Sequence, residues 1–219
     1  MIYDLTNKLK NKFASIISPC VIKYYKNKEC KALKNKDFSI LCSNCIGGII
    51  YNRLGMEFLS PTINMWETQH DFIKFAINPK YYVNQPLEFI ETDEPTPVAK
   101  CGDILLHFNH HNNAADAERD WNRRKIRINY DNIYIILYYR EGYTIEEIRE
   151  IEKAKCKNIV VLTDRELPLD YAVVMKPNLE RMHGDSFIDK DKYGITTFEK
   201  QWDFVEWLNS ERRIDAKCK

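Results

Sequence analysis

The sequence predicts an α/β fold in which a mixed, largely parallel sheet is flanked by helices, with a basic helical arm at the N-terminus. Two observations lead to this prediction. Short apolar segments of strand length alternate with segments of helical periodicity along most of the chain. The segment NIYIILYY at 132–139 is apolar almost throughout, which indicates a buried strand. With 219 residues, 44% of them apolar, the chain is long enough to bury one core.

The expected elements follow in order along the chain. Strands are expected at 38–41, 87–90, 103–108, 132–139, 158–163 and 171–175. Helices are expected at 44–54, 69–76, 80–84, 113–128, 144–154 and 198–208. Residues suited to capping, Thr68, Asn113 and the pair Thr144 and Glu147, mark the starts of several of these helices. A charged stretch at 180–193 is expected to be mobile.

Residues 1–36 are interpreted as a basic amphipathic helical arm, and residues 37–219 as a single α/β domain. The arm holds nine lysines against Asp4 and Glu29. The apolar residues at helical spacing in the arm are Leu5, Leu9, Phe13, Ile16 and Ile17. Such an arm can attach to an anionic membrane surface. Alternatively its apolar stripe packs on the domain, and the short stripe without a Trp favours this second interpretation.

Composition argues against several classes of protein. No apolar segment approaches the ~20 residues of a membrane span, and the N-terminus lacks the pattern of a signal peptide. Seven scattered cysteines do not form a disulfide framework, so a cytoplasmic location is expected, peripheral at the inner membrane if the arm binds lipid. The adjacent Tyr24 and Tyr25 are no repeated stacking platform, so nucleic acid is not an expected partner.

Chemistry is expected at the strand–turn–helix junction within 38–62. Cys45 falls in the first helical turn, where the helix dipole stabilises a thiolate. Asn44 can cap this helix through its side-chain oxygen. Gly47 and Gly48 either let the helix pack closely on the sheet or let a substrate approach the backbone N–H groups. Both interpretations of the glycines stay open at this point.

The expected strand at 103–108 ends in a cluster of histidines, His107, His110 and His111. Ligands of parallel sheets bind beyond the carboxyl ends of the strands, so these histidines, Cys45 and Arg140 are expected around one cleft. Residues three apart on a strand face opposite ways. We therefore expect only one of His107 and His110 to reach Cys45.

Several motifs in order resemble a known bacterial family. They are SNC-x-GG at 43–48, SPT at 60–62, HF-x-H at 107–110 and W-x-RR-x-x-RIN at 121–129. This pattern, over about residues 36–208, is similar to the family called domain of unknown function 1919. The resemblance implies an α/β fold and a role in exopolysaccharide or lipopolysaccharide synthesis, with no settled reaction. The substrate-binding residues expected from these motifs are Asn44, Gly47, Gly48, Ser60 and Thr62.

The chain departs from the pattern of that family at two positions. Ile46 stands where members commonly have an aromatic residue, and His111 where they have a tyrosine. Neither position carries a side chain that we expect to react.

The order of the motifs also resembles, more distantly, that of papain-like proteins, in which a helix-opening Cys precedes a strand-borne His. Cys45 would then be the nucleophile and His107 or His110 the base, with N–H groups near the helix start binding an oxyanion. The candidates to orient the base are Asp103, Asn109 and Asp131. The alternative is that Cys45 is an unreactive, packed thiol.

Other groups of residues allow further interpretations. Arg123, Arg124 and Arg127 are expected either to hold a phosphate or to pair with acidic neighbours on a solvated helix face. Cys42 and Cys45 have thioredoxin-like spacing, and together with His107 and His110 they could gather a zinc ion, although neither pattern is specific.

These observations lead to three functional hypotheses. The first is a transferase of surface-polysaccharide synthesis that transfers an acyl group through a Cys–His site. The second is a glycosyltransferase or phosphotransferase whose arginines, with Arg140, hold a phosphorylated sugar donor, although no GxGxxG nucleotide fingerprint is present. The third is a non-catalytic component of a membrane-associated assembly complex. The expected substrate is a carbohydrate or sugar phosphate, with an acyl donor or nucleotide-sugar as co-substrate and no resident cofactor or metal.

Overall fold

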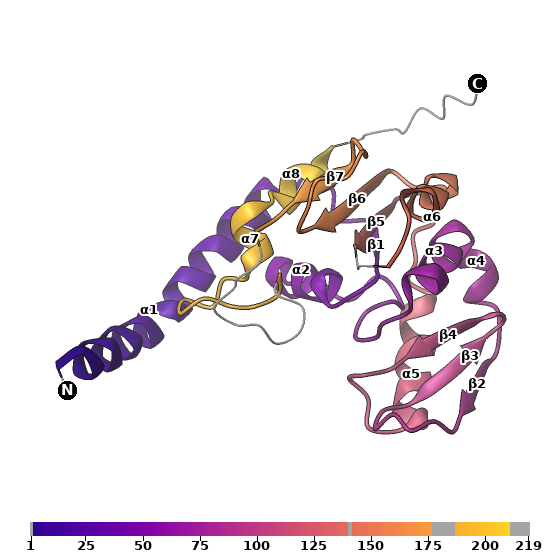
Figure 1. Cartoon of the computed structure of the whole chain (residues 1–219), viewed down its shortest axis with the longest axis horizontal. Helices are drawn as coiled ribbons and strands as arrows, with labels where there is room; N and C mark the ends of the chain where they lie inside the picture. Colours follow the sequence, from indigo (N-terminus) through magenta and orange to yellow (C-terminus); the bar gives the residue numbers. More distant parts are fainter. Residues whose placement is uncertain (1, 140–141, 177–186, 211–219) are drawn as a thin grey trace.

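The computed structural model describes residues 2–139, 142–176 and 187–210, and it confirms the α/β class (Figure 1). A four-stranded parallel sheet has the order β1-β5-β6-β7, and a separate antiparallel sheet has the order β2-β3-β4. The strands are β1 (Ser39–Cys42), β2 (Leu87–Ile90), β3 (Val98–Cys101), β4 (Ile104–His107), β5 (Ile133–Tyr138), β6 (Asn158–Thr163) and β7 (Ala172–Val174). The helices are α1 (Ile2–Ala32), α2 (Ile46–Leu54), α3 (Gln69–Ile77), α4 (Pro79–Tyr82), α5 (Ala114–Lys125), α6 (Ile145–Arg149), the 3₁₀ turn η1 (Glu150–Lys153), α7 (Thr197–Gln201) and α8 (Phe204–Asn209).

The parallel sheet is buried on both faces. Along β5, Ile133, Ile135 and Leu137 enter one core, which also contains residues of α3, α5, α6 and the antiparallel sheet. Tyr134 and Ile136 enter a second core with residues of α2, α7 and α8. Because successive side chains of a strand point to opposite faces, burial of both faces requires the nearly continuous apolar segment seen in the sequence.

The antiparallel sheet departs from the expected arrangement. The strand expected at 103–108 does not join the parallel sheet, because β4 pairs with β3, whose register places Val98 opposite His107. β3 itself was not expected, since it is only four residues long and directly follows the proline-rich turn that ends at Pro97. The turn between β3 and β4 contains Gly102 with φ +62°.

The predicted caps are present, but the C-terminal helix is divided. Thr68, Asn113 and Thr144 each accept a hydrogen bond from the third backbone N–H that follows. The helix expected at 198–208 consists of α7 and α8, because the Asp203 carboxylate accepts hydrogen bonds from two N–H groups at the start of α8. The expected mobile stretch lies partly outside the described residues.

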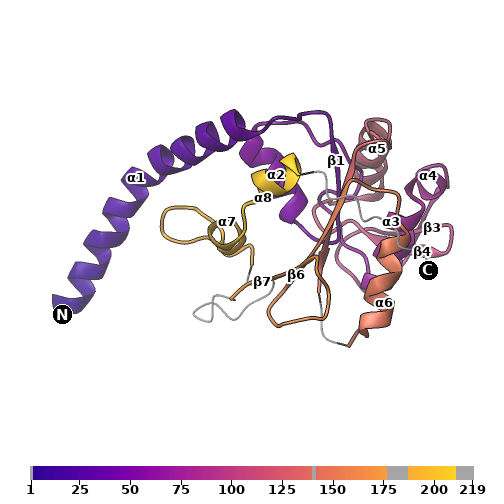
Figure 2. The same cartoon turned by 90° about the horizontal axis from the view of Figure 1, so that it is seen from above.

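The arm forms one helix, α1, with Pro19 inside it, and this helix extends away from the two sheets (Figures 1 and 2). Its later turns contact the domain through Glu29, which lies 3.7 Å from Arg53 of α2, while Arg53 also pairs with Glu199 of α7 at 2.6 Å. The expected stripe does not face the domain, since Phe13 and Ile16 are 65% and 66% exposed. The preferred interpretation of the arm therefore does not hold for these two residues of the stripe, whereas Ile17 is half-buried. None of the helices in the described part of the chain is long and apolar enough to cross a membrane.

The glycines of α2 are explained by packing. A Cβ on Gly47 would lie 2.8 Å from the Cβ of Cys42 and 3.1 Å from the side chain of Ile63. A Cβ on Gly48 would lie 3.1 Å from a terminal methyl of Ile63. The absence of side chains at these two positions allows the first turn of α2 to lie directly against β1 and the loop after α2.

We predict that Gly47→Ala destabilises the protein by about 2 kcal/mol. The new methyl would meet the Cβ of Cys42, which no side-chain rotation can move away, so the cost should be at the upper end of the about 1–3 kcal/mol of overpacking, and the gain in helix propensity returns only about 1 kcal/mol. Gly48→Ala is the control, since the Ile63 methyl can move, and its cost should be below about 1 kcal/mol. Urea unfolding measures both. A Gly47→Ala protein as stable as wild type would contradict the packing explanation.

We also predict that the folded state becomes less stable as pH rises, because of the partly buried carboxyl of Glu29. Burial raises the pKa of this carboxyl to about 7, against the attraction of Arg53. The folded state therefore holds the proton more tightly than the unfolded state, and stability decreases as pH rises from about 4.5 to 7. Glu29→Gln should be more stable than wild type at pH 8, by up to about 3 kcal/mol, and equally stable near pH 4. Urea unfolding at several pH values, with the exposed Glu166→Gln as control, tests this; a constant difference would refute it.

Candidate functional site

Cys45 and His110 lie together where the parallel sheet meets the turn after β4. Cys45 is the N-cap residue of α2, separated from the end of β1 by Ser43 and Asn44, and it is half-buried. His110 is exposed in the turn that follows β4. The Sγ atom of Cys45 lies 3.4 Å from Nε2 of His110. The expected nucleophile and one of the two expected bases are therefore in hydrogen-bond contact.

A backbone bridge between two segments sets this contact. Trp66, in the loop after α2, and His107, at the end of β4, exchange two N–H···O hydrogen bonds of 3.0 Å. Their rings stack with centroids 3.8 Å apart. Phe108 is buried directly beyond the bridge. The turn that carries His110 is thereby anchored to the loop whose Ile63 packs on the first turn of α2.

His107 has a different environment. Its Nδ1 atom lies 2.9 Å from a carboxylate oxygen of Glu94, and its ring is covered by Trp66. These contacts assign His107 to holding the loop, and they leave His110 as the candidate base. Sequence reasoning did not identify Trp66 or Glu94, because neither stands at a meaningful spacing from the histidines.

The turn between β1 and α2 is organised around a buried thiol. Cys42 donates to the side-chain oxygen of Asn44 at 3.2 Å and accepts from the N–H of Gly47 at 3.3 Å. The same Asn44 oxygen accepts the N–H of Ile46, the first residue of α2, at 3.0 Å, so Asn44 satisfies a donor of the helix start from the position before the N-cap residue Cys45. The N–H of Ile46, expected to bind an oxyanion, is therefore already engaged within the turn.

Burial raises the pKa of Cys42 to about 12, so this thiol stays protonated. A thioredoxin-like pair requires two reactive sulfurs, and Cys42 is not one. Glu67 is a buried residue that sequence reasoning missed, and its charge also contributes to raising the pKa of Cys42. No sequence motif marks this glutamate.

The hydroxyls of Ser60 and Thr62 form hydrogen bonds beside the turn between β1 and α2. The hydroxyl of Thr62 accepts the N–H of Cys42 at 3.1 Å, and the two hydroxyls lie 3.1 Å apart. Both residues are fully buried. They were expected to contact substrate, but the Thr62 hydroxyl satisfies a backbone N–H at the end of β1, and the Ser60 hydroxyl accepts the N–H of Thr62.

Asp103 does not reach the Cys–His pair. It directly precedes β4, at the opposite end of that strand from His107. Its carboxylate accepts from Lys74 at 2.7 Å and from the hydroxyl of Tyr82 at 2.8 Å, and these contacts lower its pKa. It therefore does not orient His110 as expected. Arg140 lies outside the described residues.

The arginines of the α5 region are held by protein groups. Arg124, expected to face outward or sideways, is only 4% exposed, and it donates to the carbonyl oxygen of Ile63 at 2.7 Å and to Asp120 at 2.6 Å. Arg123 pairs with Asp120 at 2.8 Å, and Arg127 with Glu57 at 3.3 Å. The second interpretation of the arginines, ion pairing with acidic neighbours, agrees with these contacts.

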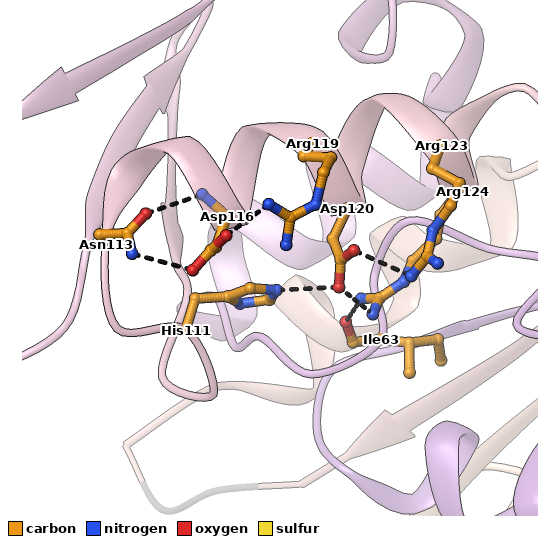
Figure 3. A network of polar contacts seen from close by, with 8 residues as sticks. All are labelled: Ile63, His111, Asn113, Asp116, Arg119, Asp120, Arg123 and Arg124. Atoms are coloured by element: carbon orange, nitrogen blue, oxygen red, sulfur yellow. Dashed lines mark hydrogen bonds and ion pairs between the residues drawn. The ribbon is translucent and has the colours of Figure 1, made fainter.

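Asp120 connects both sides of the site (Figure 3). His111 reaches its carboxylate through Nε2 at 3.3 Å, and Arg124 reaches it from the other side. Burial opposes the ionisation of Asp120, but Arg124 and His111 outweigh it and lower its pKa. His111 is the neighbour of His110, and Arg124 holds the Ile63 loop that packs on α2. Asp120 thus ties the turn of the base to the support of the nucleophile.

The residues proposed for zinc do not form a metal site. Within the described ranges, no group of three or more His, Cys, Asp or Glu side chains is placed to hold a metal ion. His107 contacts Glu94, and Cys42 bonds within its own turn.

Comparison with known proteins agrees with the motifs. The sequence pattern of the family described as "Domain of unknown function (DUF1919)" matches residues 6–209. The chain belongs to the DUF1919 family. A relative from Haemophilus influenzae (strain ATCC 51907 / DSM 11121 / KW20 / Rd), named "Uncharacterized protein", is 29% identical over 181 residues, which are 82% of this chain and 87% of the relative. The DUF1919 match begins earlier than the expected residue 36 and includes most of α1.

We predict that Asp120→Asn destabilises this DUF1919 protein by about 3 kcal/mol, because it leaves the buried Arg124 without its counter-charge. Asp116→Asn, on the same helix, is the matched control. Its ion pair with Arg119 is exposed, so its loss should cost less than about 1 kcal/mol. Urea unfolding of the two variants compares them. Equal effects would show that Asp120 does not hold the site together.

Proposed function

We propose that this protein is an acyltransferase that acts through a thioester on Cys45, with His110 as general base. The observation that carries the proposal is the 3.4 Å contact between Sγ of Cys45 and Nε2 of His110. A cysteine at the start of a helix, paired with a histidine, has the features of an activated nucleophile. The exposure of His110 and the partial exposure of Cys45 leave the pair accessible to a substrate.

The proposed reaction has two steps. In the first, Nε2 of His110 takes the thiol proton, and the thiolate attacks the acyl carbonyl carbon. The bond to the leaving group breaks, and His110 returns the proton to that group. In the second, His110 takes a proton from an acceptor hydroxyl, which attacks the thioester, and the carbon–sulfur bond breaks. His110 returns the proton to the sulfur of Cys45, so that the acyl group is on the acceptor and Cys45 is a thiol again.

The proposed acceptor is a carbohydrate of a bacterial surface polysaccharide. This part rests on the resemblance that the sequence motifs carry. It is chemically consistent with the site, because sugars offer the hydroxyl groups that the second step requires. The competing hypothesis of a phosphorylated donor held by arginines has less support, since Arg124 is buried in protein contacts.

We predict that Cys45 reacts selectively with iodoacetamide, with an apparent pKa below the ~8.5 of a free thiol. The exposed Cys20 is an internal reference in the same protein. His110→Ala should slow the labelling of Cys45 at pH 7 at least tenfold and leave that of Cys20 unchanged, whereas the exposed His70→Ala should change neither. Peptide mass spectrometry over a pH series measures both rates. Labelling of Cys45 that is no faster than that of Cys20 would argue against a thiolate.

The acyl step is tested with p-nitrophenyl acetate as an activated donor. We expect a burst of p-nitrophenol and an acetyl adduct on Cys45 that hydroxylamine removes. Cys45→Ala should abolish both without unfolding the domain. Full function of Cys45→Ala in polysaccharide-producing cells would end the proposal, and it would favour the non-catalytic hypothesis.

A further inference from the structure

The outward face of α1 carries an apolar stripe. Phe13, Ile16 and Tyr24 are 65%, 66% and 65% exposed, and Cys20 between them is also exposed. Their spacing of three or four residues places them on one side of the helix. From Phe13 to Tyr24 the stripe is roughly 17 Å long at 1.5 Å per residue. Large apolar side chains that are grouped in this way indicate a surface that binds something.

The opposite side of α1 contacts the domain. Ala14 is buried, and the hydroxyl of Ser18 donates to the carbonyl oxygen of Tyr193 at 2.7 Å. Further along, Arg53 lies 3.7 Å from Glu29. The helix is therefore attached by one side while the stripe points away from the domain.

The arm is positively charged, and its described part has exposed lysines. Residues 1–36 contain nine lysines and two acidic residues, Asp4 and Glu29. Glu29 is turned toward Arg53, so it does not offset the exposed lysines. Lys23 and Lys31 are exposed on either side of Tyr24 in the sequence. Figures 1 and 2 show that α1 projects from the two sheets, so a flat surface can reach it.

We propose that α1 lies in the plane of an anionic lipid membrane, with the stripe at the boundary of headgroups and acyl chains and the lysines at the lipid phosphates. An apolar helix face with exposed lysines is complementary to such a surface. A second copy of the chain is less suited to cover the stripe, because the positive charges of its arm would repel those of the first arm. The proposal does not depend on the chemistry of Cys45. It gives the protein a place at the membrane surface, where the lipid-linked precursors of polysaccharides are assembled.

The first experiment is co-sedimentation of the full chain with vesicles. Vesicles of phosphatidylcholine with 30% phosphatidylglycerol are compared with vesicles of phosphatidylcholine alone, at low and at high salt. We expect binding to the anionic vesicles at least tenfold tighter than to the neutral ones, and weaker binding at high salt. No binding to anionic vesicles, or equal binding to both kinds, overturns the proposal.

Variants then test the stripe and the lysines separately. Phe13→Ser with Ile16→Ser should weaken binding at least tenfold, and Lys23→Gln with Lys31→Gln roughly tenfold or more. The control is Ile126→Ser, because Ile126 is 79% exposed at the end of α5, outside the arm, and it should have no effect. Circular dichroism checks that each variant is folded. Unchanged binding of the stripe variant, or an equal loss with Ile126→Ser, contradicts the proposal.

The mass of the protein in solution distinguishes a stripe that binds a membrane from a stripe that binds a second copy of the chain. We expect a monomer by light scattering without vesicles, for wild type and for the stripe variant. A dimer that Phe13→Ser with Ile16→Ser dissociates would show that another copy covers the stripe, and it would overturn the membrane proposal.

Discussion

The backbone bridge between Trp66 and His107 is the interaction on which the candidate site depends. The parallel sheet and the antiparallel sheet share no strand, and this bridge joins the loop after α2 to the last residue of β4. Without it, nothing in the local sequence of β4 would direct the following turn toward α2. The stacking of the two rings and the contact of His107 with Glu94 reinforce the pairing. The catalytic pair that we propose is thus a consequence of how two sheets are joined.

Buried polar groups hold the two halves of the site in register. Arg124 and Asp120 are costly to remove from water, and the structure compensates them with short hydrogen bonds and an ion pair. The same guanidinium would suit a phosphate ligand if it were exposed. Its burial, rather than its chemistry, assigns it to the scaffold, and the same is true of the hydroxyls of Ser60 and Thr62.

The two sides of α1 have different environments. One side is attached to the domain by Ser18 and Glu29, and the other presents apolar side chains among lysines. In the proposed arrangement, the Cys–His pair would belong to a domain held at a lipid surface by its first helix. Catalysis and attachment would then depend on separate parts of the chain.

The sequence by itself determined the class of the fold and the ends of several elements. The apolar segment of β5, the caps at Thr68 and Asn113 and the capping box of Thr144 depend on local spacing, and local spacing is visible in a sequence. It also placed Cys45 at the start of a helix and predicted that one of two histidines would reach it.

The tertiary structure alone decided the rest, because each remaining choice depends on contacts between distant segments. It selected His110 over His107, placed β4 in a second sheet, and engaged Arg124 with Ile63, 61 residues earlier in the chain. It also decided which side of α1 meets the domain. Periodicity identifies an apolar stripe, but whether that stripe is covered depends on what the remaining chain packs against it.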